Sequence, residues 1–373
     1  MYKRQDTDLT DIPTNAISLA VAQKCNLGCT YCYAEGGDFG QESESMPLEK
    51  ALQSIDYLLD NAEPGERRNI AFMGGEPLLN RSVLRKATEY ASQKAPQLGI
   101  QLGFSITSNG TLITEDDGDF FEEHGFAVTI SLDGLGGTHD KLRPYKSGRS
   151  NYETIIKNIQ PLLNSQSKSQ VSARVTVTPE NLNLRETLIG LIDLGFHSVG
   201  FSPMISSPTG LCEMQTEHLE EHLRQMIQCG ELFYQHAIEG KRFPFSNVKS
   251  ALKEIHNGSH RPYPCGAGAG YLGVSAKGDL FACHRFVGDE QANFGSVSAG
   301  LDTSVQSEWL SKKHVHFQSP CNTCWARYLC GGGCHHEVKN RGRVNCEYIR
   351  GWLEYCLKLY ARINHQLPAF FDR

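Results

Sequence analysis

Three cysteines near the N-terminus present thiols at a spacing that suits a metal cluster. The segment is Cys25-Asn-Leu-Gly-Cys29-Thr-Tyr-Cys32, a C-x3-C-x2-C triplet. Three thiolates on one short loop can hold three corners of a cubane iron–sulfur cluster and leave one iron open to a ligand from outside the protein. A closed zinc site would need further Cys or His ligands nearby. No cysteine lies between Cys32 and Cys212, so the triplet predicts an open iron at which chemistry can occur.

A second group of cysteines lies in the C-terminal third of the chain. Its spacing includes C-x2-C, C-x5-C and C-x3-C steps, and several thiolates this close together also suggest bound metal. Tetrahedral zinc is the alternative to iron–sulfur clusters here. The candidate metal ligands of this group are Cys265, Cys283, Cys321, Cys324, Cys330, Cys334 and Cys346.

Composition indicates a globular protein of the reducing cytoplasm. The chain has 373 residues, 39% hydrophobic and 21% charged, with a net charge of −6 and a pI near 6.2. This charge balance gives no basic footprint for nucleic acid, and no apolar run approaches the ~18–20 residues of a membrane span. The polar segment Met1–Thr14 does not resemble a signal peptide. The thirteen cysteines are therefore predicted to be reduced and largely bound to metal, not paired in disulfides.

Residues 16 to 204 alternate β-like runs with amphipathic helical stretches, which predicts a parallel sheet covered by helices. Six such units are too few for an eight-stranded barrel, so we expect a curved, partly open (β/α)6 barrel. Loops after the strands carry chemistry in such folds, and the cysteine triplet follows the first strand. The expected strands are Ala16–Gln23, Asn69–Met73, Gly103–Ser108, Ala127–Asp133, Val171–Thr178 and Ser198–Pro203. The expected helices between them are Pro47–Ala62, Val83–Ala95, Asp119–His124, Tyr152–Leu163 and Leu184–Leu194.

The pattern changes after Pro208. Two helices, Thr216–Ala237 and Asn247–Ile255, are expected to lead into a loop-rich region that begins near Tyr263 and lacks regular periodicity until a helix at Cys346–Asn364. A region with so little apolar core needs metal to hold it together. The predicted organisation is a tail (1–15), a barrel (16–207), a helical linker (208–262), a cysteine-rich domain (263–356) and a C-terminal helix and tail (357–373).

Polar and glycine-rich motifs stand where three further strands end. They are Met73-Gly-Gly-Glu-Pro77, Thr107-Ser-Asn-Gly110 and Ile130-Ser-Leu-Asp-Gly134. With the triplet and the aromatic Tyr31 before its last cysteine, residues 16–204 resemble the radical S-adenosylmethionine (SAM) enzymes. The resemblance implies a [4Fe–4S] cluster on the three cysteines and SAM bound to the open iron through its methionine group.

The resemblance also implies roles for individual residues. Gly74 and Gly75 would take the methionine amino group of SAM, Ser131 its ribose or carboxylate, and Arg174 its carboxylate. Other roles remain open: the glycines could form only a tight turn, Asn109 could cap a turn, and Arg174 could pair with an acid on a helix. The catalytic cluster ligands are Cys25, Cys29 and Cys32, and the cofactor-binding residues are Tyr31, Gly74, Gly75, Glu76, Pro77, Asn109, Ser131 and Arg174.

The C-terminal cysteines resemble the SPASM domain found on radical SAM enzymes that modify peptides. The resemblance implies two auxiliary [4Fe–4S] clusters, three clusters in all. One would use Cys321, Cys324, Cys330 and Cys346, and the other Cys265, Cys283 and Cys334, with its fourth ligand undetermined. Cys356 lies in a helical pattern and is expected to be a buried thiol, while Cys212 and Cys229 belong to no motif.

The local sequences around Cys265 and Cys283 are similar to maturases that cross-link ribosomal precursor peptides through thioether, C–C or C–O bonds. Such maturases include the SCIFF maturases and the maturase of quinohemoprotein amine dehydrogenase. We therefore expect a peptide cross-linking enzyme with a precursor-peptide substrate and a flavodoxin or ferredoxin as electron donor. No leader-peptide module is expected, because fifteen residues precede the first strand.

Two other functions remain open. One is an anaerobic sulfatase maturase or another radical SAM dehydrogenase; sulfatase maturases carry an acid where this chain has His284. The other is an iron–sulfur or zinc protein without catalytic activity.

Overall fold

One long sheet organises the computed structural model, which describes residues 13–371. Its strand order is β11-β10-β9-β8-β1-β3-β4-β5-β6-β7, with β2 beside β1. The strands are β1 (Ala16–Gln23), β2 (Glu44–Ser45), β3 (Arg67–Gly74), β4 (Gln101–Ser108), β5 (Ala127–Ser131), β6 (Gln170–Val177), β7 (Ser198–Pro203), β8 (Tyr271–Val274), β9 (Asp279–Phe281), β10 (Asn293–Ser296) and β11 (Gly300–Leu301). Most of the expected N-terminal tail, residues 1–12, lies outside the described residues.

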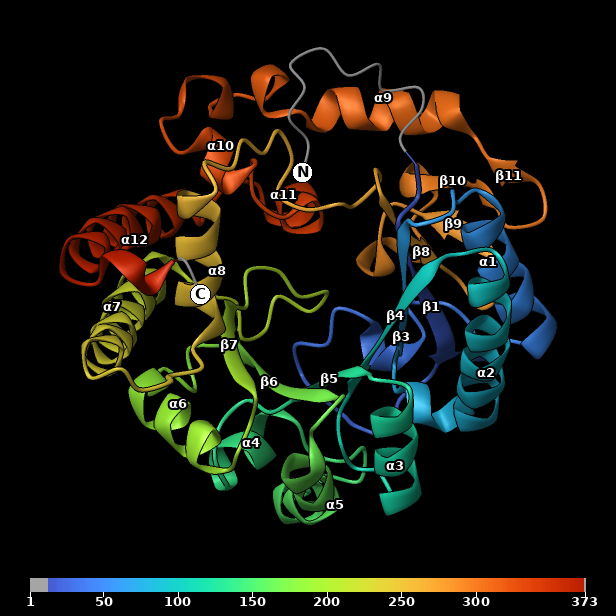
Figure 1. The fold of residues 1–373 in the computed structure, drawn as a ribbon, viewed down its shortest axis with the longest axis horizontal. Helices are drawn as coiled ribbons and strands as arrows, with labels where there is room; N and C mark the ends of the chain where they lie inside the picture. The colour runs from blue at the N-terminus through green and yellow to red at the C-terminus, as the bar shows by residue number, and fades with distance from the viewer. Residues whose placement is uncertain (1–12, 372–373) are drawn as a thin grey trace.

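The predicted half-open barrel is confirmed. Strands β1 and β3 to β7 pair in parallel, each with the next, and helices lie along the outside of the curved sheet (Figure 1). The barrel helices are α1 (Leu48–Asp60), α2 (Arg81–Gln97), α3 (Glu115–Glu123), α4 (Gly137–Leu142), α5 (Tyr152–Ser165) and α6 (Leu184–Asp193). The remaining helices are α7 (Thr216–Ile238), α8 (Ser246–His256), α9 (Thr303–Lys313), α10 (Arg327–Cys330), α11 (His335–Arg341) and α12 (Cys346–Gln366).

The barrel core lies between the sheet and the barrel helices α1 to α6. Stacked aromatic rings occupy it, with centroids 6.0 Å apart for Phe72 and Phe126 and 5.4 Å apart for Phe104 and Phe126. Such burial of apolar surface is the main term that holds the layers together.

The cysteine-rich region is more regular than expected. Strand β8 pairs in parallel with β1, in a register that sets Ile17 beside Leu272, and β8 and β9 form an antiparallel pair. The sheet therefore continues through the expected boundary at residue 263. Strands of two to four residues are too short to show an alternating pattern, which is why the sequence did not indicate them.

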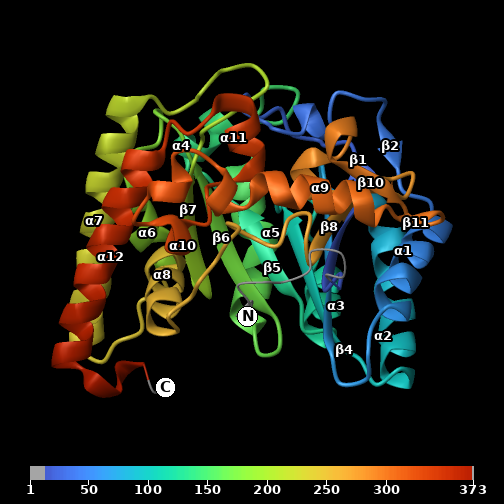
Figure 2. The ribbon, with the colours of Figure 1, turned by 90° about the horizontal axis from the view of Figure 1, so that it is seen from above.

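The catalytic end of the barrel is the end at which the parallel strands terminate. Figure 2 shows α4, which follows β5, and α11 of the cysteine-rich region at this same end of the sheet. Both groups of cysteines are thereby brought to one face. Within residues 13–371, none of the helices is long and apolar enough to cross a membrane.

Candidate active site

The three N-terminal thiols lie together on the loop after β1. Leu27, which is 1% exposed, anchors this loop through an antiparallel bridge to Tyr145. Burial raises the pKa of Cys25 and raises that of Cys29 to about 12, and the nearby thiol of Cys32 adds to both shifts. Thiolates in such a place need positive charge close by. The donor set therefore fits an iron–sulfur cluster, which binds thiolates and supplies that charge.

A buried network ties this loop to the barrel. The Tyr31 hydroxyl donates to Oδ2 of Asp133, and Arg143 Nη1 donates to the Tyr31 hydroxyl at 2.9 Å and lies 3.6 Å from Asp133 Oδ2. The Thr176 amide donates to the other Asp133 oxygen at 2.8 Å. Burial raises the pKa of Asp133 to about 6, and the Arg143 charge opposes this rise. Arg143 also lowers the pKa of Cys29, so it provides positive charge beside the thiols.

Gly74 and Gly75 let two chain segments approach closely. A Cβ on Gly74 would lie 2.4 Å from the Ala22 carbonyl oxygen, and one on Gly75 would lie 2.3 Å from that of Lys24. The Gly75 amide already donates to Ala22 at 2.8 Å. Pro77 follows and begins a 3₁₀ turn. The motif thus holds β3 against the cysteine loop, and its carbonyl groups are the acceptors it can offer to a SAM ammonium.

Buried Glu76 accepts hydrogen bonds from residues at the end of β4. Its side chain is fully buried, and Oε1 accepts hydrogen bonds from the Leu78 amide at 3.1 Å and the Ser108 hydroxyl at 3.0 Å. Oε2 accepts one from the Asn109 amide at 2.7 Å. Asn109 in turn places its side-chain nitrogen 3.7 Å from Cys25 Sγ. Glu76 therefore positions Asn109, which lies beside the cluster thiols.

Ser131 and Arg174 are direct neighbours across β5 and β6. Arg174 donates to the Ser202 hydroxyl on β7. Its side chain is exposed, yet burial lowers its pKa, with Tyr348 and Glu337 of the cysteine-rich region acting on it electrostatically. Arg174 therefore lies near residues of the cysteine-rich region.

Three C-terminal thiols, those of Cys265, Cys283 and Cys334, form a second group. Burial raises the pKa of Cys283 to about 12, and Cys334 and Cys265 both add to this shift. Arg285 Nη1 lies 3.6 Å from Cys334 Sγ and donates to Glu337 at 2.8 Å. The second triplet therefore has its own positive charge, as the first has Arg143.

Tyr33 lies between the two triplets. Burial raises the pKa of its phenol, and a thiol from each triplet, Cys32 and Cys283, adds to the rise. The Arg285 guanidinium lies 5.1 Å from the centre of its ring, and the His284 ring meets it edge-on at 5.9 Å. Neither Tyr33 nor Arg285 had a role predicted from the sequence. The one sequence feature that could have indicated them is that each lies within two residues of a motif cysteine.

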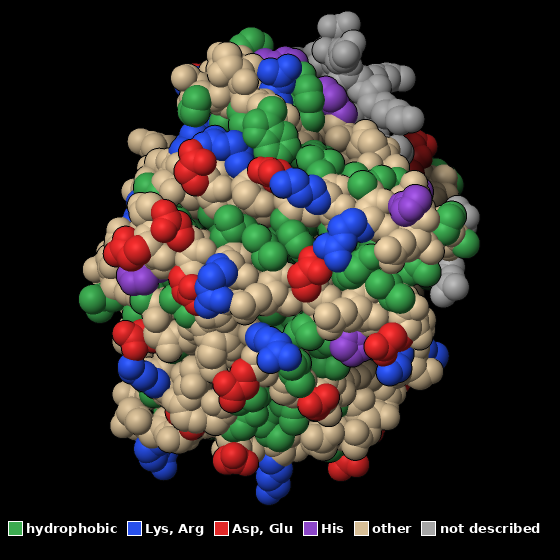
Figure 3. Space-filling model, turned by 90° about the vertical axis from the view of Figure 1, so that its left-hand side faces the viewer, with side chains coloured by type: hydrophobic (Ala, Val, Ile, Leu, Met, Phe, Trp, Pro, Cys, Tyr) green, Lys and Arg blue, Asp and Glu red, His purple; other side chains and the backbone are tan. Residues whose placement is uncertain are grey.

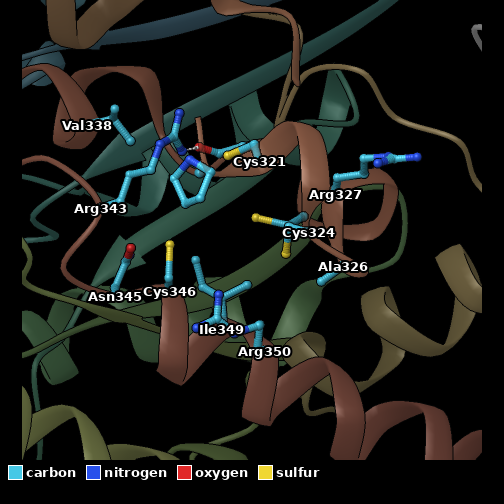
Figure 4. Close-up of a pocket in the computed structure, with 14 residues that line it drawn as sticks. Cys321, Cys324, Ala326, Arg327, Val338, Arg343, Asn345, Cys346, Ile349 and Arg350 are labelled. Carbon is cyan, nitrogen blue, oxygen red and sulfur yellow. Dashed lines mark hydrogen bonds between the residues drawn. The ribbon is translucent and has the colours of Figure 1, made fainter. Parts of the chain in front are cut away.

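The remaining four motif cysteines surround one hollow near the surface (Figure 4). The labelled sulfurs of Cys324 and Cys346 point into it, and Arg343 lies beside them. Four thiols around one hollow are the donor set of a [4Fe–4S] cluster. The four cysteines that line it are Cys321, Cys324, Cys330 and Cys346.

Three cysteines lie outside these groups. Cys356 and Cys229 are fully buried in α12 and α7, as expected for Cys356. Cys212, to which the sequence assigned no role, has its Sγ 3.5 Å from the Thr30 hydroxyl and packs against the same small apolar cluster as Cys29. It therefore lies next to the first triplet.

A cavity of about 660 Å³ opens between the barrel and the cysteine-rich region. Tyr33, which directly follows Cys32, and Arg285, which lies two residues after Cys283, are among its lining residues. Its other lining residues carry charges of both signs and include Glu35, Glu213, Asp289, Glu290 and Arg341.

Comparison with known families agrees with this geometry. Residues 19–192 match the Radical SAM superfamily. These residues, a little under half of the chain, form a radical SAM domain. The chain is accordingly an enzyme of the radical SAM type, and a [4Fe–4S] cluster and SAM are the cofactors of that domain. The first resemblance in the sequence analysis is thus confirmed.

Some of the relatives found extend over most of the chain. The serine-type anaerobic sulfatase-maturating enzyme of Klebsiella pneumoniae is 26% identical over 354 residues, which cover 91% of this chain and 86% of that one. The cysteine-type enzyme of Clostridium novyi is 34% identical over 144 residues, 38% of each chain. The structure of native anSMEcpe with bound AdoMet superposes with a TM-score of 0.79 at 18% identity, covering 94% of this chain and 99% of that one. This last likeness demonstrates a shared fold.

Proposed function

We propose that this radical SAM enzyme oxidises a serine or cysteine side chain in a polypeptide, as a sulfatase-maturating enzyme. The observation that carries the proposal is the cavity lined by Tyr33 and Arg285, each of which lies within two residues of a cysteine of one triplet. The length over which the chain matches the Klebsiella pneumoniae sulfatase-maturating enzyme supports this function better than the cross-linking function expected from the local sequences.

The proposed roles at the barrel follow from the contacts. Cys25, Cys29 and Cys32 hold the cluster, and Asn109 and Arg143 supply a hydrogen bond and positive charge beside it. For SAM, the carbonyls of the Gly74–Pro77 turn bind the ammonium, and Ser131 and Arg174 bind the carboxylate or ribose. Glu76 and Tyr31 position these groups from behind, since their side-chain oxygens already have protein partners.

Together the cluster and SAM supply a 5′-deoxyadenosyl radical, which removes one hydrogen atom from the substrate carbon. A serine radical then loses an electron and a proton to become the aldehyde. A cysteine radical becomes a thioaldehyde, which water hydrolyses to the aldehyde with release of hydrogen sulfide. In both cases one electron enters and one leaves in each turnover. The protein must hold one C–H bond in place and keep water away. Tyr33 and Arg285 line the cavity where this substrate carbon would lie.

Two auxiliary clusters complete the proposal. Cys265, Cys283 and Cys334 would hold one of them, which would supply an acceptor for the departing electron. Cys321, Cys324, Cys330 and Cys346 would hold the other, which would supply a route for that electron toward the surface.

A second candidate function is the cross-linking of a precursor peptide. It is favoured by His284, which stands where sulfatase maturases carry an acid. We further propose a cytoplasmic location and a flavodoxin or ferredoxin as the electron donor.

Product chemistry separates the two candidates. The anaerobically reconstituted chain is incubated with SAM, dithionite and a synthetic sulfatase peptide that contains the residue to be oxidised. For a serine substrate we expect loss of two hydrogen atoms and a product that a hydrazide reagent traps. A cross-link also removes two hydrogens, but it gives no aldehyde. In tandem mass spectrometry it also gives no backbone fragments from between the joined residues. If the peptide stays unchanged while SAM is cleaved, the sulfatase proposal is wrong.

A further inference from the structure

Three large apolar side chains are exposed around the four-cysteine hollow. Phe317 is 74% exposed, Trp325 55% and Val344 45%. Trp325 directly follows Cys324, and Val344 directly follows Arg343, both of which line the hollow. We call these three side chains the distal patch. Exposed aromatic groups of this size often mark interaction sites.

The local structure holds Phe317 at this rim. It ends a 3₁₀ turn, Val315–Phe317, that packs against a second turn, Cys321–Thr323. Arg343 donates to the Gln318 side chain from the opposite edge of the hollow. The patch is therefore built on the same turns that position the four thiols.

The hollow beside the patch is basic, although the whole chain has a net charge of −6. Its lining residues include Arg327, Arg343 and Arg350, and none of the described residues that line it is acidic. Lys312 in α9 is 68% exposed and is paired with Glu308. The upper end of Figure 3, which is the α9–α10 end of Figure 1, shows hydrophobic side chains beside Lys, Arg and His side chains.

We propose that the distal patch docks a small acidic electron-transfer protein that exchanges single electrons with the site beneath it. The proposal rests on the proposed function, which assigns a cluster to the four-cysteine hollow. Transfer moves one electron between the partner's flavin or iron–sulfur group and this cluster, and no bond forms or breaks. Because tunnelling weakens steeply with distance, a partner must dock where a cluster lies close to the surface.

The chemistry of the patch matches this occupant. Transient electron-transfer complexes use small interfaces, which three apolar side chains and a cationic rim can provide. Aromatic residues and arginine are enriched at the centres of such interfaces. A basic rim also attracts a negatively charged partner and speeds association in a salt-dependent way.

Binding to a flavodoxin of net negative charge tests the proposal. The reconstituted full chain is immobilised anaerobically, and the dissociation constant is measured by biolayer interferometry at low and moderate salt. We expect Phe317→Ser to weaken binding about tenfold and Lys312→Glu to weaken it about threefold at low salt. Lys312 lies in α9, where it pairs with Glu308, and its replacement leaves the thiols untouched.

Matched controls come from the barrel side of the chain. Lys241 is 67% exposed and paired with Glu239, as Lys312 is with Glu308, and Ile238 is 46% exposed. Lys241→Glu and Ile238→Ser should bind flavodoxin as the wild type does. The proposal is overturned if Phe317→Ser and Lys312→Glu bind normally, or if the controls weaken binding equally.

Two further readouts separate this proposal from the proposed function. Iron content and dithionite-driven cleavage of SAM should be unchanged in Phe317→Ser and Lys312→Glu, because dithionite needs no docking surface. Failure of the wild type in these assays would instead count against the proposed function. If size-exclusion chromatography finds a dimer that Phe317→Ser dissociates, the patch joins two copies of this chain and the docking proposal is wrong.

Discussion

Adding one methyl group at Gly75 should disable SAM cleavage. The Cβ of Gly75→Ala would lie 2.3 Å from the Lys24 carbonyl oxygen, 2.5 Å from its carbon and 2.7 Å from the Gly37 Cα. All three are backbone atoms, so no side chain can turn away to make room. The residue next to Lys24 is Cys25, the first cluster ligand.

The size of the effect follows from these distances. Ordinary contact begins near 3.4 Å, so the cysteine loop and the end of β3 must separate by about 1 Å. Overpacking of this kind costs about 1–3 kcal/mol of stability. A displacement of about 1 Å at a reacting centre lowers rates by about a hundredfold. We expect the larger loss in SAM cleavage and a smaller one in the free energy of unfolding.

The assay compares Gly75→Ala with Gly137→Ala. A Cβ at Gly137, which starts α4 at the same end of the barrel, meets nothing within 4 Å. The iron content, the dissociation constant of SAM and the rate of 5′-deoxyadenosine formation are measured for both. Gly137→Ala should match the wild type. If Gly75→Ala binds SAM and forms 5′-deoxyadenosine as the wild type does, the close approach at Gly75 is not needed for SAM cleavage and the prediction is wrong.

Three other outcomes follow from the structure. Arg143→Met should cost about 3–5 kcal/mol in anaerobic urea unfolding, because it leaves the buried Asp133 carboxylate without its cation; a loss below about 1 kcal/mol would contradict this. Cys324→Ala should remove about four irons per chain, whereas Cys356→Ala, with a buried thiol in α12, should retain them all; equal iron contents would exclude the four-cysteine cluster. Burial lowers the pKa of His222 to about 4 in the folded protein. As pH falls from about 6.5 toward 4, this histidine is protonated in the unfolded chain but not in the folded one, so stability falls over that range. Between pH 7.5 and pH 5.5, the free energy of unfolding should therefore fall by about 1 kcal/mol less in His222→Phe than in the wild type. If urea unfolding shows the same pH dependence in both proteins, this prediction is wrong.

The barrel strands were predictable, because strands buried on both faces read as apolar runs. The bounds of β1 and β7 coincide with those expected. Helix α3 was expected from Asp119 but begins at Glu115. Its first turn is acidic, and it is held by a capping box from Thr114 and by ion pairs from Arg81 and Arg85 to Asp117. Those partners come from α2, so no local hydrophobic pattern could indicate this turn.

The surroundings of the site were harder to predict than its ligands. Arg143 and Arg285 lie beside the two thiol triplets, and Cys212 lies beside Thr30 of the first triplet's loop. The positions of such groups depend on how distant loops pack, and a single charged residue carries no spacing signal.

The sequence by itself determined the radical SAM barrel and the sets of cysteines. Ligands such as Cys25, Cys29 and Cys32 are close along the chain, so their spacing already limits what they can bind. Only the tertiary structure decided that the second triplet faces the first across Tyr33. That arrangement requires β8 to pair with β1, more than 240 residues earlier in the chain. Such long-range contacts form because the whole sheet and its core pack together, and no local pattern of residues encodes them.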